Sequence, residues 1–261
     1  MDDEALATLE HDNLVATLSP FGAAWDGGLV RTTDGVTLIS TGLPVRLFNQ
    51  VLVSGPEATD DGVRQAVDEI RTRTDRFVLN LRVGPDDRFL PLASRLGLEP
   101  ISPTPWMPGM AMWPLASGDA ASMPAGHEIR RATDASGIAD HALVAAEGFG
   151  MPIEWVQGLV ADALDDPTAR VYVGYDDGVP VTAGLGKATG RTIGIYNIAT
   201  VPAARRRGNG AAMTMRIVED GAAEGCDVAI LQASDMGRPT YERLGFRLVV
   251  EYAGYADPIG P

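Results

Sequence analysis

The hydrophobic pattern along the chain alternates between two periods, and each period predicts one kind of element. Residues 60–72 place Val63, Ala66, Val67 and Ile70 three or four positions apart, the spacing of one helix face. Apolar, β-branched runs bounded by polar residues predict strands over 29–32, 36–41, 45–53, 77–83, 128–131, 171–175, 179–187, 193–201, 228–232 and 246–252. Further helices are expected over 89–96, 135–147, 153–164, 210–224 and 238–244. Strands and helices alternate, so the pattern predicts an α/β protein.

Local signals predict several element ends, and one segment has no clear type. Thr59 and Asp134 are residue types that cap a helix N-terminus, and each precedes a helical pattern. Gly97 and Gly245 follow two short helical patterns, where a glycine readily takes the left-handed conformation that ends a helix. Residues 1–26 are expected to form a helical or irregular lead-in.

The order of elements occurs twice along the chain. Phe48-Asn49 and Tyr196-Asn197 differ by 196 − 48 = 148 positions, and Leu96-Gly97 and Leu244-Gly245 differ by 244 − 96 = 148 positions. In both halves a strand, a helix, a strand and a short helix follow one another. Repetition of a whole order at a fixed offset indicates that the chain is a duplication.

A segment of linker composition separates the two halves. Residues 114–126 read PLASGDAASMPAG, which is rich in small residues, proline and glycine. We therefore expect an N-terminal domain over 1–115, a linker over 116–126 and a C-terminal domain over 127–261.

The second half contains a basic, glycine-rich turn between a predicted strand and a predicted helix. Residues 193–212 read IGIYNIATVPAARRRGNGAA. Glycines let backbone N–H groups approach an anion, and a helix N-terminus adds partial positive charge. The three arginines Arg205–Arg207 add full charges, so the turn predicts a phosphate or pyrophosphate site. At the offset of 148, residues 57–62 of the first half read EATDDG, which would repel a phosphate.

Composition narrows the class of partner. The net charge of −14 disfavours nucleic acid and anionic membranes, and mildly favours a cationic substrate such as an amine. Cys226 is the single cysteine, so neither an intrachain disulfide nor a cysteine-based metal site is expected. The acidic, polar N-terminus does not resemble a signal peptide, and no apolar run approaches the ~20 residues that span a bilayer. We expect a cytoplasmic protein with no membrane partner.

The second half resembles the GCN5-related N-acetyltransferase (GNAT) family. The resemblance is carried by Arg205, Gly208 and Gly210, which match the family's signature of arginine or glutamine, two residues, glycine, one residue, and glycine or alanine. Ser234 and Tyr241 then fall at the family's spacing. The first half resembles a degenerate copy, as in tandem proteins of actinobacterial type. The resemblance implies two mixed, mostly antiparallel sheets flanked by helices, with splayed central strands in the C-terminal domain.

The resemblance also implies acetyl-CoA as co-substrate, with no metal. The backbone of residues 198–200 would pair with the pantetheine arm, and the N–H groups of residues 206–211 would hold the pyrophosphate. The cofactor-binding residues implied are Ile198, Ala199, Thr200, Val201, Arg205, Arg206, Arg207, Gly208, Asn209, Gly210, Ala211 and Ser234.

Tyr241 stands where the family places its general acid, which protonates the departing thiolate. The chain departs from the family at the general base, because neither IGIYNIATV nor VAILQAS contains a carboxylate. Glu147 is the first candidate, because it precedes a flexible Gly148-Phe149-Gly150 break; Glu154 and His141 are others. The alternatives are a water relay, or no base at all because the amine arrives deprotonated. The candidate acceptor-lining residues are Tyr196, Asn197 and Phe149.

The resemblance implies an N-acetyltransferase in which a primary amine of a small molecule or peptide attacks acetyl-CoA directly in a ternary complex. A mycothiol-synthase-like or antibiotic-modifying enzyme differs only in the acceptor. A non-catalytic acyl-CoA-binding or regulatory protein is the alternative from another class, and the missing strand carboxylate keeps it open. The two halves predict either a monomer that is a pseudo-dimer or a true homodimer.

Overall fold

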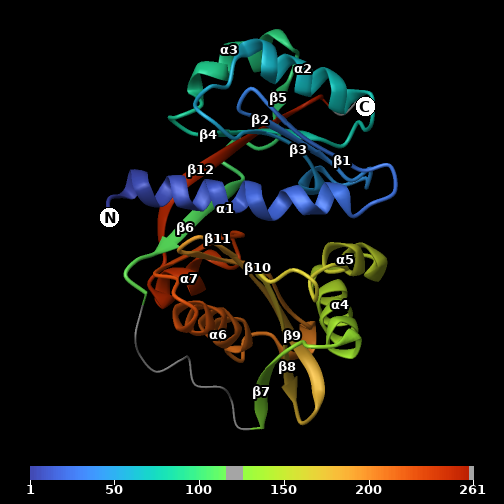
Figure 1. Ribbon diagram of the computed structural model, residues 1–261, viewed down its shortest axis with the longest axis vertical. Coiled ribbons are helices and arrows are strands. Elements are labelled where there is room, and N and C mark those ends of the chain that lie inside the picture. Colours follow the sequence, from blue (N-terminus) through green and yellow to red (C-terminus); the bar gives the residue numbers. More distant parts are fainter. Residues whose placement is uncertain (116–125, 259–261) are drawn as a thin grey trace. The chain divides into compact units, whose positions relative to one another are not determined.

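The computed structural model of the chain describes residues 1–115 and 126–258 (Figure 1). The expected linker, 116–126, lies outside the described residues except at its last position. Within the described ranges, no helix combines the length and the apolar character that crossing a membrane requires.

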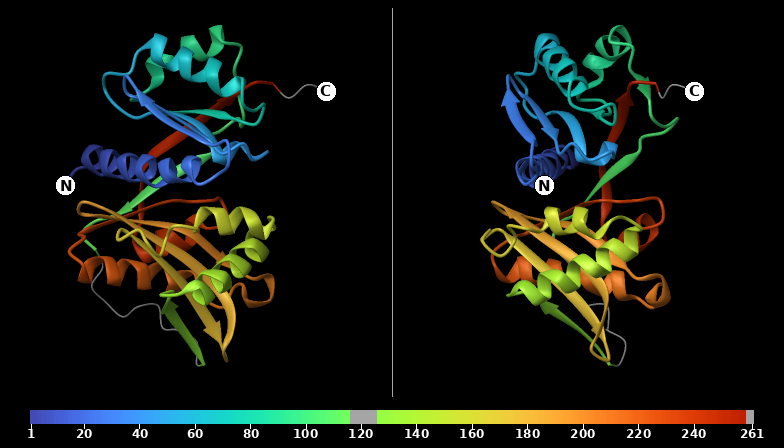
Figure 2. Two further views of the ribbon diagram at one scale, coloured as in Figure 1. Left: turned by 45° about the vertical axis from the view of Figure 1, so that its right-hand side comes forward. Right: turned by 90° about the vertical axis from the view of Figure 1, so that its right-hand side faces the viewer.

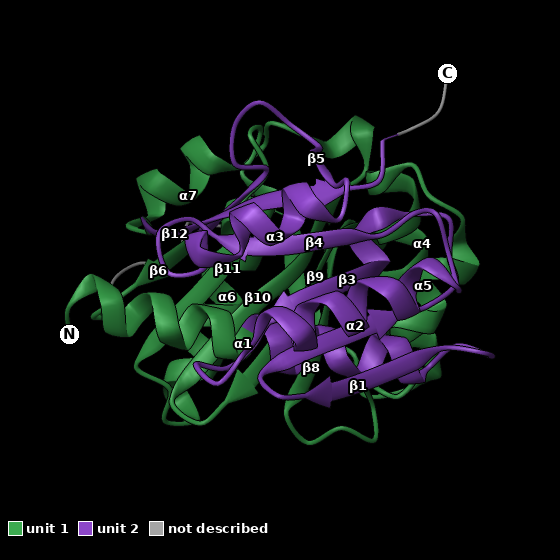
Figure 3. Ribbon diagram, turned by 90° about the horizontal axis from the view of Figure 1, so that it is seen from above, with its two compact units in different colours: residues 1–13, 110–247 green, residues 14–109, 248–261 purple. Residues whose placement is uncertain are grey.

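The chain forms two compact units, and each is discontinuous in sequence (Figure 3). Unit 1 comprises residues 1–13 and 110–247, and unit 2 comprises residues 14–109 and 248–261. This division differs from the expected one at the linker, where each domain was a continuous half.

Each unit includes the last strand of the other sequence half. In β6 (Met107–Met112), Met110 and Met112 are buried in the core cluster of unit 1. In β12 (Arg247–Ala256), residues from Tyr252 onward pair antiparallel with β4 (Val78–Arg82) of unit 2. A compact unit therefore cannot be cut from this chain at one position.

Unit 2 is a sheet with the strand order β1-β2-β3-β4-β12. Pairs β1–β2 and β2–β3 are antiparallel, whereas β3 and β4 are parallel. The remaining bounds are β1 Leu29–Thr33, β2 Val36–Ser40, β3 Asn49–Val53, β5 Glu99–Pro100, α2 Asp60–Arg71 and α3 Leu90–Arg95, with short 3₁₀ turns at Arg46–Phe48 and Asp87–Phe89.

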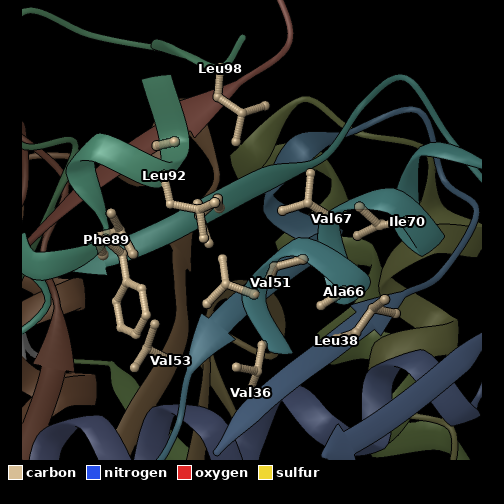
Figure 4. Close-up of a cluster of buried hydrophobic side chains, with 14 of the residues drawn as sticks. Val36, Leu38, Val51, Val53, Ala66, Val67, Ile70, Phe89, Leu92 and Leu98 are labelled. Atoms are coloured by element: carbon tan, nitrogen blue, oxygen red, sulfur yellow. The ribbon is translucent and has the colours of Figure 1, made fainter. Parts of the chain in front are cut away.

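The core of unit 2 confirms the helical periodicity of the sequence. The four residues predicted to share one face of α2, Val63, Ala66, Val67 and Ile70, are all buried. They pack on apolar side chains of β2, β3 and α3, which Figure 4 shows converging from both layers. Thr59 caps α2 as expected, because its side chain accepts a hydrogen bond from the Gly62 N–H.

Unit 1 contains the sheet run β11-β10-β9-β8-β7. The strands from β7 to β10 are antiparallel neighbours, and β10 pairs parallel with β11. Its strand bounds are β7 His127–Arg131, β8 Ala169–Asp176, β9 Val179–Thr189, β10 Thr192–Thr200 and β11 Val228–Gln232. Its helices are α4 Ala135–Phe149, α5 Ile153–Leu159, α6 Asn209–Ala223 and α7 Arg238–Leu244, and α1 (Asp3–Ala23) adds residues up to Asn13.

Helices cover both faces of the unit 1 sheet (Figure 2). Ile193 and Ile195 of β10 pack in the cluster that includes residues of α6. Ala199 of the same strand packs with residues of α4, in a separate cluster. The α/β class expected from the sequence is confirmed.

Three expectations needed correction. The helix expected over 153–164 ends at Leu159, and residues up to 165 form turns. The strand β6 was not expected, because Pro108 and Gly109 are poor strand formers. The strand expected over 45–53 begins only at Asn49, after a 3₁₀ turn at Arg46–Phe48. The lead-in is helical, one of the two forms expected, because α1 occupies most of its length.

Gly221 allows α6 to lie close to β10. A Cβ atom at this position would lie 2.9 Å from the Cβ of Ile193, so a side chain forces the two elements apart. We expect Gly221→Val to lower the free energy of unfolding by about 1–3 kcal/mol, measured by urea denaturation. Ala222→Val, which places the same side chain on the exposed neighbouring position, should cost less than about 0.5 kcal/mol. Equal stability of both variants would contradict the close packing.

Candidate active site

The central feature of unit 1 is that the parallel ladder between β10 and β11 ends before either strand does. The two strands pair at Thr192↔Val228, Ile193↔Ala229 and Gly194↔Ile230. In the part of the chain that the structure describes, this ladder includes no residue of β10 beyond Gly194, although β10 continues to Thr200. We call the opening between residues 195–200 of β10 and 231–232 of β11 the strand gap. Its β10 edge presents backbone N–H and C=O groups that can pair with an extended ligand.

A β-bulge shapes the edge of the strand gap. On the β9 side, pairing passes from Tyr196↔Leu185 to Ala199↔Ala183, so two residues of β10 oppose one residue of β9. Asn197 in the bulge has φ 52°, a left-handed conformation that asparagine adopts more readily than most residues. The bulge breaks the alternation of β10, and such a break re-aims backbone groups beside a binding site.

The basic turn follows directly after β10. Arg206 (φ 61°) and Gly208 (φ 88°) are both left-handed, and α6 begins at Asn209. Such a turn at a helix N-terminus points successive N–H groups toward one space, which suits an anion. A Cβ at Gly210 would lie 3.6 Å from Ile198 Cγ2, so the start of α6 lies against the strand-gap end of β10. The turn and the strand gap are therefore continuous.

The three arginines of the turn differ in their contacts. Arg205 donates from Nε to the Thr200 carbonyl at 3.1 Å and from Nη2 to the Gly148 carbonyl at 2.8 Å. It thereby ties the end of α4 to the end of β10. Arg207 lies 3.8 Å from an Asp176 oxygen, and Arg206 is exposed. Arg206 thus has the position expected of a residue that meets an anion from solvent.

Tyr241 and Ser234 come together near the end of β11. Ser234 Oγ accepts a hydrogen bond from the Gly237 N–H at 3.1 Å. A Cβ at Gly237 would lie 2.9 Å from Tyr241 Cε2 and 3.3 Å from Ser234 Oγ, so the two side chains flank this glycine. Burial raises the pKa of Tyr241 to about 12, so its phenol keeps the proton at neutral pH. A protonated phenol is what a general acid requires.

Two of the candidate residues on the acceptor side, Glu147 and Phe149, lie at the end of α4. A Cβ at Gly148 would lie 2.9 Å from the Ala199 Cβ, which brings this end of the helix against β10. Glu147 is exposed on the last turn, and Phe149 is 47% exposed. The structure thus brings Phe149 and Glu147 near the far end of β10, while Tyr196 lies nearer the ladder end.

His141 differs from the other candidate bases in being fully buried. Its Nδ1 lies 3.1 Å from the Tyr172 carbonyl oxygen, inside the layer between α4 and β8. Burial lowers its pKa to about 4, because the charged imidazolium is disfavoured away from water. His141 is therefore a neutral core residue.

Sequence reasoning missed two buried polar residues of α1. Asn13 Oδ1 accepts a hydrogen bond from the Tyr196 hydroxyl at 2.6 Å, and Asn13 Nδ2 donates to the Lys187 carbonyl at 3.0 Å. Glu10 Oε1 accepts from Gln232 Nε2 at 2.5 Å. Tyr196 and Gln232 stand on the two strands of the gap, and Asn13 Nδ2 also donates to Thr189 Oγ1 of β9 at 2.7 Å. A sequence signal existed only in Gly194, the one glycine of β10.

Comparison with known proteins identifies one domain of the chain. Residues 128–241 match the model of the acetyltransferase (GNAT) domain. This part of the chain is a GNAT-type domain, and the match supports an enzyme of the N-acetyltransferase class. A search of the curated proteins found no match to this chain.

Solved structures similar to this chain include GNAT proteins that match it over most of its length. A GCN5-related N-acetyltransferase from Kribbella flavida has a TM-score of 0.70 at 17% identity, over 95% of this chain and 96% of that one. One from Sphaerobacter thermophilus has 0.64 at 17% identity, over 88% and 83%. A tandem GNAT protein from the clavulanic acid biosynthesis pathway, without AcCoA, has 0.59 at 15% identity, over 87% and 79%. The similarity in fold to these GNAT structures therefore covers both halves of this chain.

Because His141 is buried, we expect the free energy of unfolding of the GNAT domain to depend on pH. Its pKa is lowered from 6.5 to about 4, so the neutral form stabilises the fold above pH ~6.5, and this contribution is lost as the pH falls toward 4. We expect urea unfolding to show a loss of up to about 3 kcal/mol from this group. His141→Asn should flatten the dependence over this pH range. An unchanged slope would show that another group causes it.

Proposed function

We propose that this protein transfers the acetyl group of acetyl-CoA to a primary amine of a small molecule or peptide, by direct attack in a ternary complex. The observation that carries the proposal is the continuity of the strand gap with the basic turn. One opening thus offers a backbone edge for an extended arm and, at its end, N–H groups for a pyrophosphate.

The residues present fit coenzyme A. Its pantetheine arm contains amides that pair with a strand edge, which suits the backbone of Ile198, Ala199 and Thr200 up to Val201. The pyrophosphate suits the N–H groups from Arg206 to Ala211, with Arg206 and Arg207 adding charge. Asn209 stabilises this turn, because its Nδ2 donates to the Ala204 carbonyl at 3.1 Å.

The first sequence half offers no equivalent site. In unit 2, β3 stays paired with β4 through Leu52, its next-to-last residue. A Cβ at Gly55 would lie 2.5 Å from a carboxylate oxygen of Glu57, so an acidic side chain lies against Gly55, just before the corresponding turn. A closed ladder and an acidic turn support a single co-substrate site.

Acetyl-CoA supplies the acetyl group as a thioester. A new N–C bond forms as the amine attacks, the C–S bond breaks, and the thiolate takes a proton. Tyr241 donates that proton, because a phenol with the ordinary pKa of 10 is protonated at neutral pH and burial raises the pKa of Tyr241 further, to about 12. Backbone N–H groups on the open edge of β10 stabilise the oxyanion of the tetrahedral intermediate.

The basic turn is tested by acetyl-CoA binding. We expect the double variant Arg206→Glu, Gly208→Asp to weaken binding by at least about 100-fold in isothermal titration, because it adds repulsion and an unfavourable left-handed side chain. Arg64→Glu, an exposed charge reversal in unit 2, is the control and should leave the affinity unchanged. Equal affinity of the double variant and the wild type would refute the site.

The acid role is tested by Tyr241→Phe. We expect kcat for thiol release to fall by about 10- to 100-fold, with KM for acetyl-CoA within twofold, because the ring remains packed on Phe246 while the donor is lost. A screen of primary amines, followed by thiol release, supplies the acceptor. Full kcat across the pH range in the variant would exclude the role. Acetyl-CoA binding without turnover on any amine would favour an acyl-CoA-binding protein instead.

A further inference from the structure

The strands that border the strand gap contain no acidic residue. β10 reads TIGIYNIAT and β11 reads VAILQ, so neither provides a carboxylate that takes a proton from the amine. We propose that Glu10, on α1, is the group that accepts this proton. The inference rests on the acetyl transfer proposed above.

The register of β10 and β11 places two polar side chains at one level of the sheet. Gly194 pairs with Ile230, so two residues further on Tyr196 and Gln232 stand at the same level, on either side of the strand gap. Because strand side chains alternate, both lie on the face opposite to that of Ile193 and Ile195, which pack toward α6. Tyr196 and Gln232 therefore mark the two sides of the gap on one face.

The helix α1 binds both of these side chains. Glu10 and Asn13 are three positions apart, so they project from one face of the helix. Asn13 Oδ1 accepts from the Tyr196 hydroxyl at 2.6 Å, and Glu10 Oε1 accepts from Gln232 Nε2 at 2.5 Å. One helical turn thus bridges the strand gap at the point where the ladder ends.

Gly194 leaves room for the side chains that meet on this face. A Cβ at Gly194 would clash with Asn13 Oδ1 and lie 2.5 Å from Tyr196 Cε2, so a side chain there would force the Asn13–Tyr196 pair to move. The lack of a side chain at Gly194 therefore preserves the contact between α1 and β10.

The contacts of Glu10 suit a proton acceptor. Its side chain is fully buried, so it is held in one place rather than solvated. The donation from Gln232 fixes one carboxylate oxygen beside the strand gap. As the N–C bond forms, the proton of the attacking nitrogen passes to this carboxylate, which becomes a carboxylic acid. The proton leaves to solvent before the next turnover, and no other reactant is needed.

Several titratable groups of unit 1 surround this face. His11 is buried on the same helix, and Tyr196 stands on β10. Lys187 on β9 forms an ion pair with Asp166, whose pKa is lowered by its hydrogen bonds to Lys187 and Thr168 against an opposing burial effect. Variants at Glu10 must therefore be compared over the whole pH profile, so that the titration of these neighbours is separated from that of Glu10.

The test compares Glu10→Gln and Glu10→Asp with Glu4→Gln, an exposed control on the same helix. Two rates are measured by thiol release: transfer to the best amine of the screen and hydrolysis of acetyl-CoA without acceptor. We expect Glu10→Gln to lower both rates by about 100-fold or more near neutral pH, with the acetyl-CoA Kd within threefold of wild type. Its transfer rate should then rise with pH toward the wild-type value. Glu10→Asp should restore part of the rate, and Glu4→Gln should match the wild type.

A second variant tests the role without removing the carboxylate. Gln232→Met takes away the donor that orients Glu10, and we expect a five- to tenfold lower kcat with a shifted pH profile and an unchanged acetyl-CoA Kd. If Glu10→Gln fails to fold, the result for Gln232→Met decides whether Glu10 accepts the proton. An unchanged profile in Gln232→Met, or wild-type rates in folded Glu10→Gln, overturns the inference. So does a loss of activity in Glu147→Gln that Glu10→Gln does not share.

The two proposals fail in different ways. A wild-type protein that binds no acetyl-CoA refutes the proposed function. A protein that binds acetyl-CoA and releases thiol at the same rate with and without the Glu10 carboxylate refutes only the inference on Glu10.

Discussion

The rest of unit 1 depends on a parallel ladder that ends before its strands do. Breaking a ladder leaves backbone donors and acceptors on the β10 edge without ladder partners, which is costly unless the strand is held elsewhere. β9 holds it, since β9 and β10 pair along almost their whole length. The Thr182 hydroxyl adds a bond to the Ala199 carbonyl at 2.8 Å. Arg205 and Gly148 then attach the end of β10 to α4, so the open edge is rigid.

The duplicated half shows the same elements without that constraint. β3 and β4 of unit 2 pair through Leu52, and the polar side chains beside them bond to each other instead of to a ligand. Asn80 donates to Gln50, and Trp106 Nε1 donates to Asn80 Oδ1 at 2.8 Å. A buried polar group needs a partner, and in unit 2 every partner in this chain of bonds is internal. The two sequence halves therefore contain one closed strand pair and one open strand pair.

The elements that local sequence determines were predictable, and those that long-range contacts determine were not. Val63 and its three neighbours on α2 followed from helical spacing, and the basic turn followed from Arg206 and Gly208 at the start of a helix. The splayed strands were expected only from the resemblance to the GNAT family, because Ile195 and Ile198 read as ordinary strand residues whether or not a neighbour pairs with them. The hydrophobic periodicity likewise does not predict the bulge at Asn197, or that β6 and β12 each contribute to the unit formed mainly by the other sequence half. They arise from contacts between residues far apart in sequence.

Glu10 lies in a part of unit 1 that no sequence motif marks. Each recognisable motif lies between residues 128 and 246, yet the compact unit that holds them also needs Met110 and Met112 in its core and residues up to Asn13 of α1 on its sheet. Tyr196 and Gln232 are polar strand residues on one face of the sheet near the ladder end. Their side chains donate hydrogen bonds to Asn13 and Glu10 of α1. The first residues of the chain therefore form part of the catalytic unit, although no motif points to them.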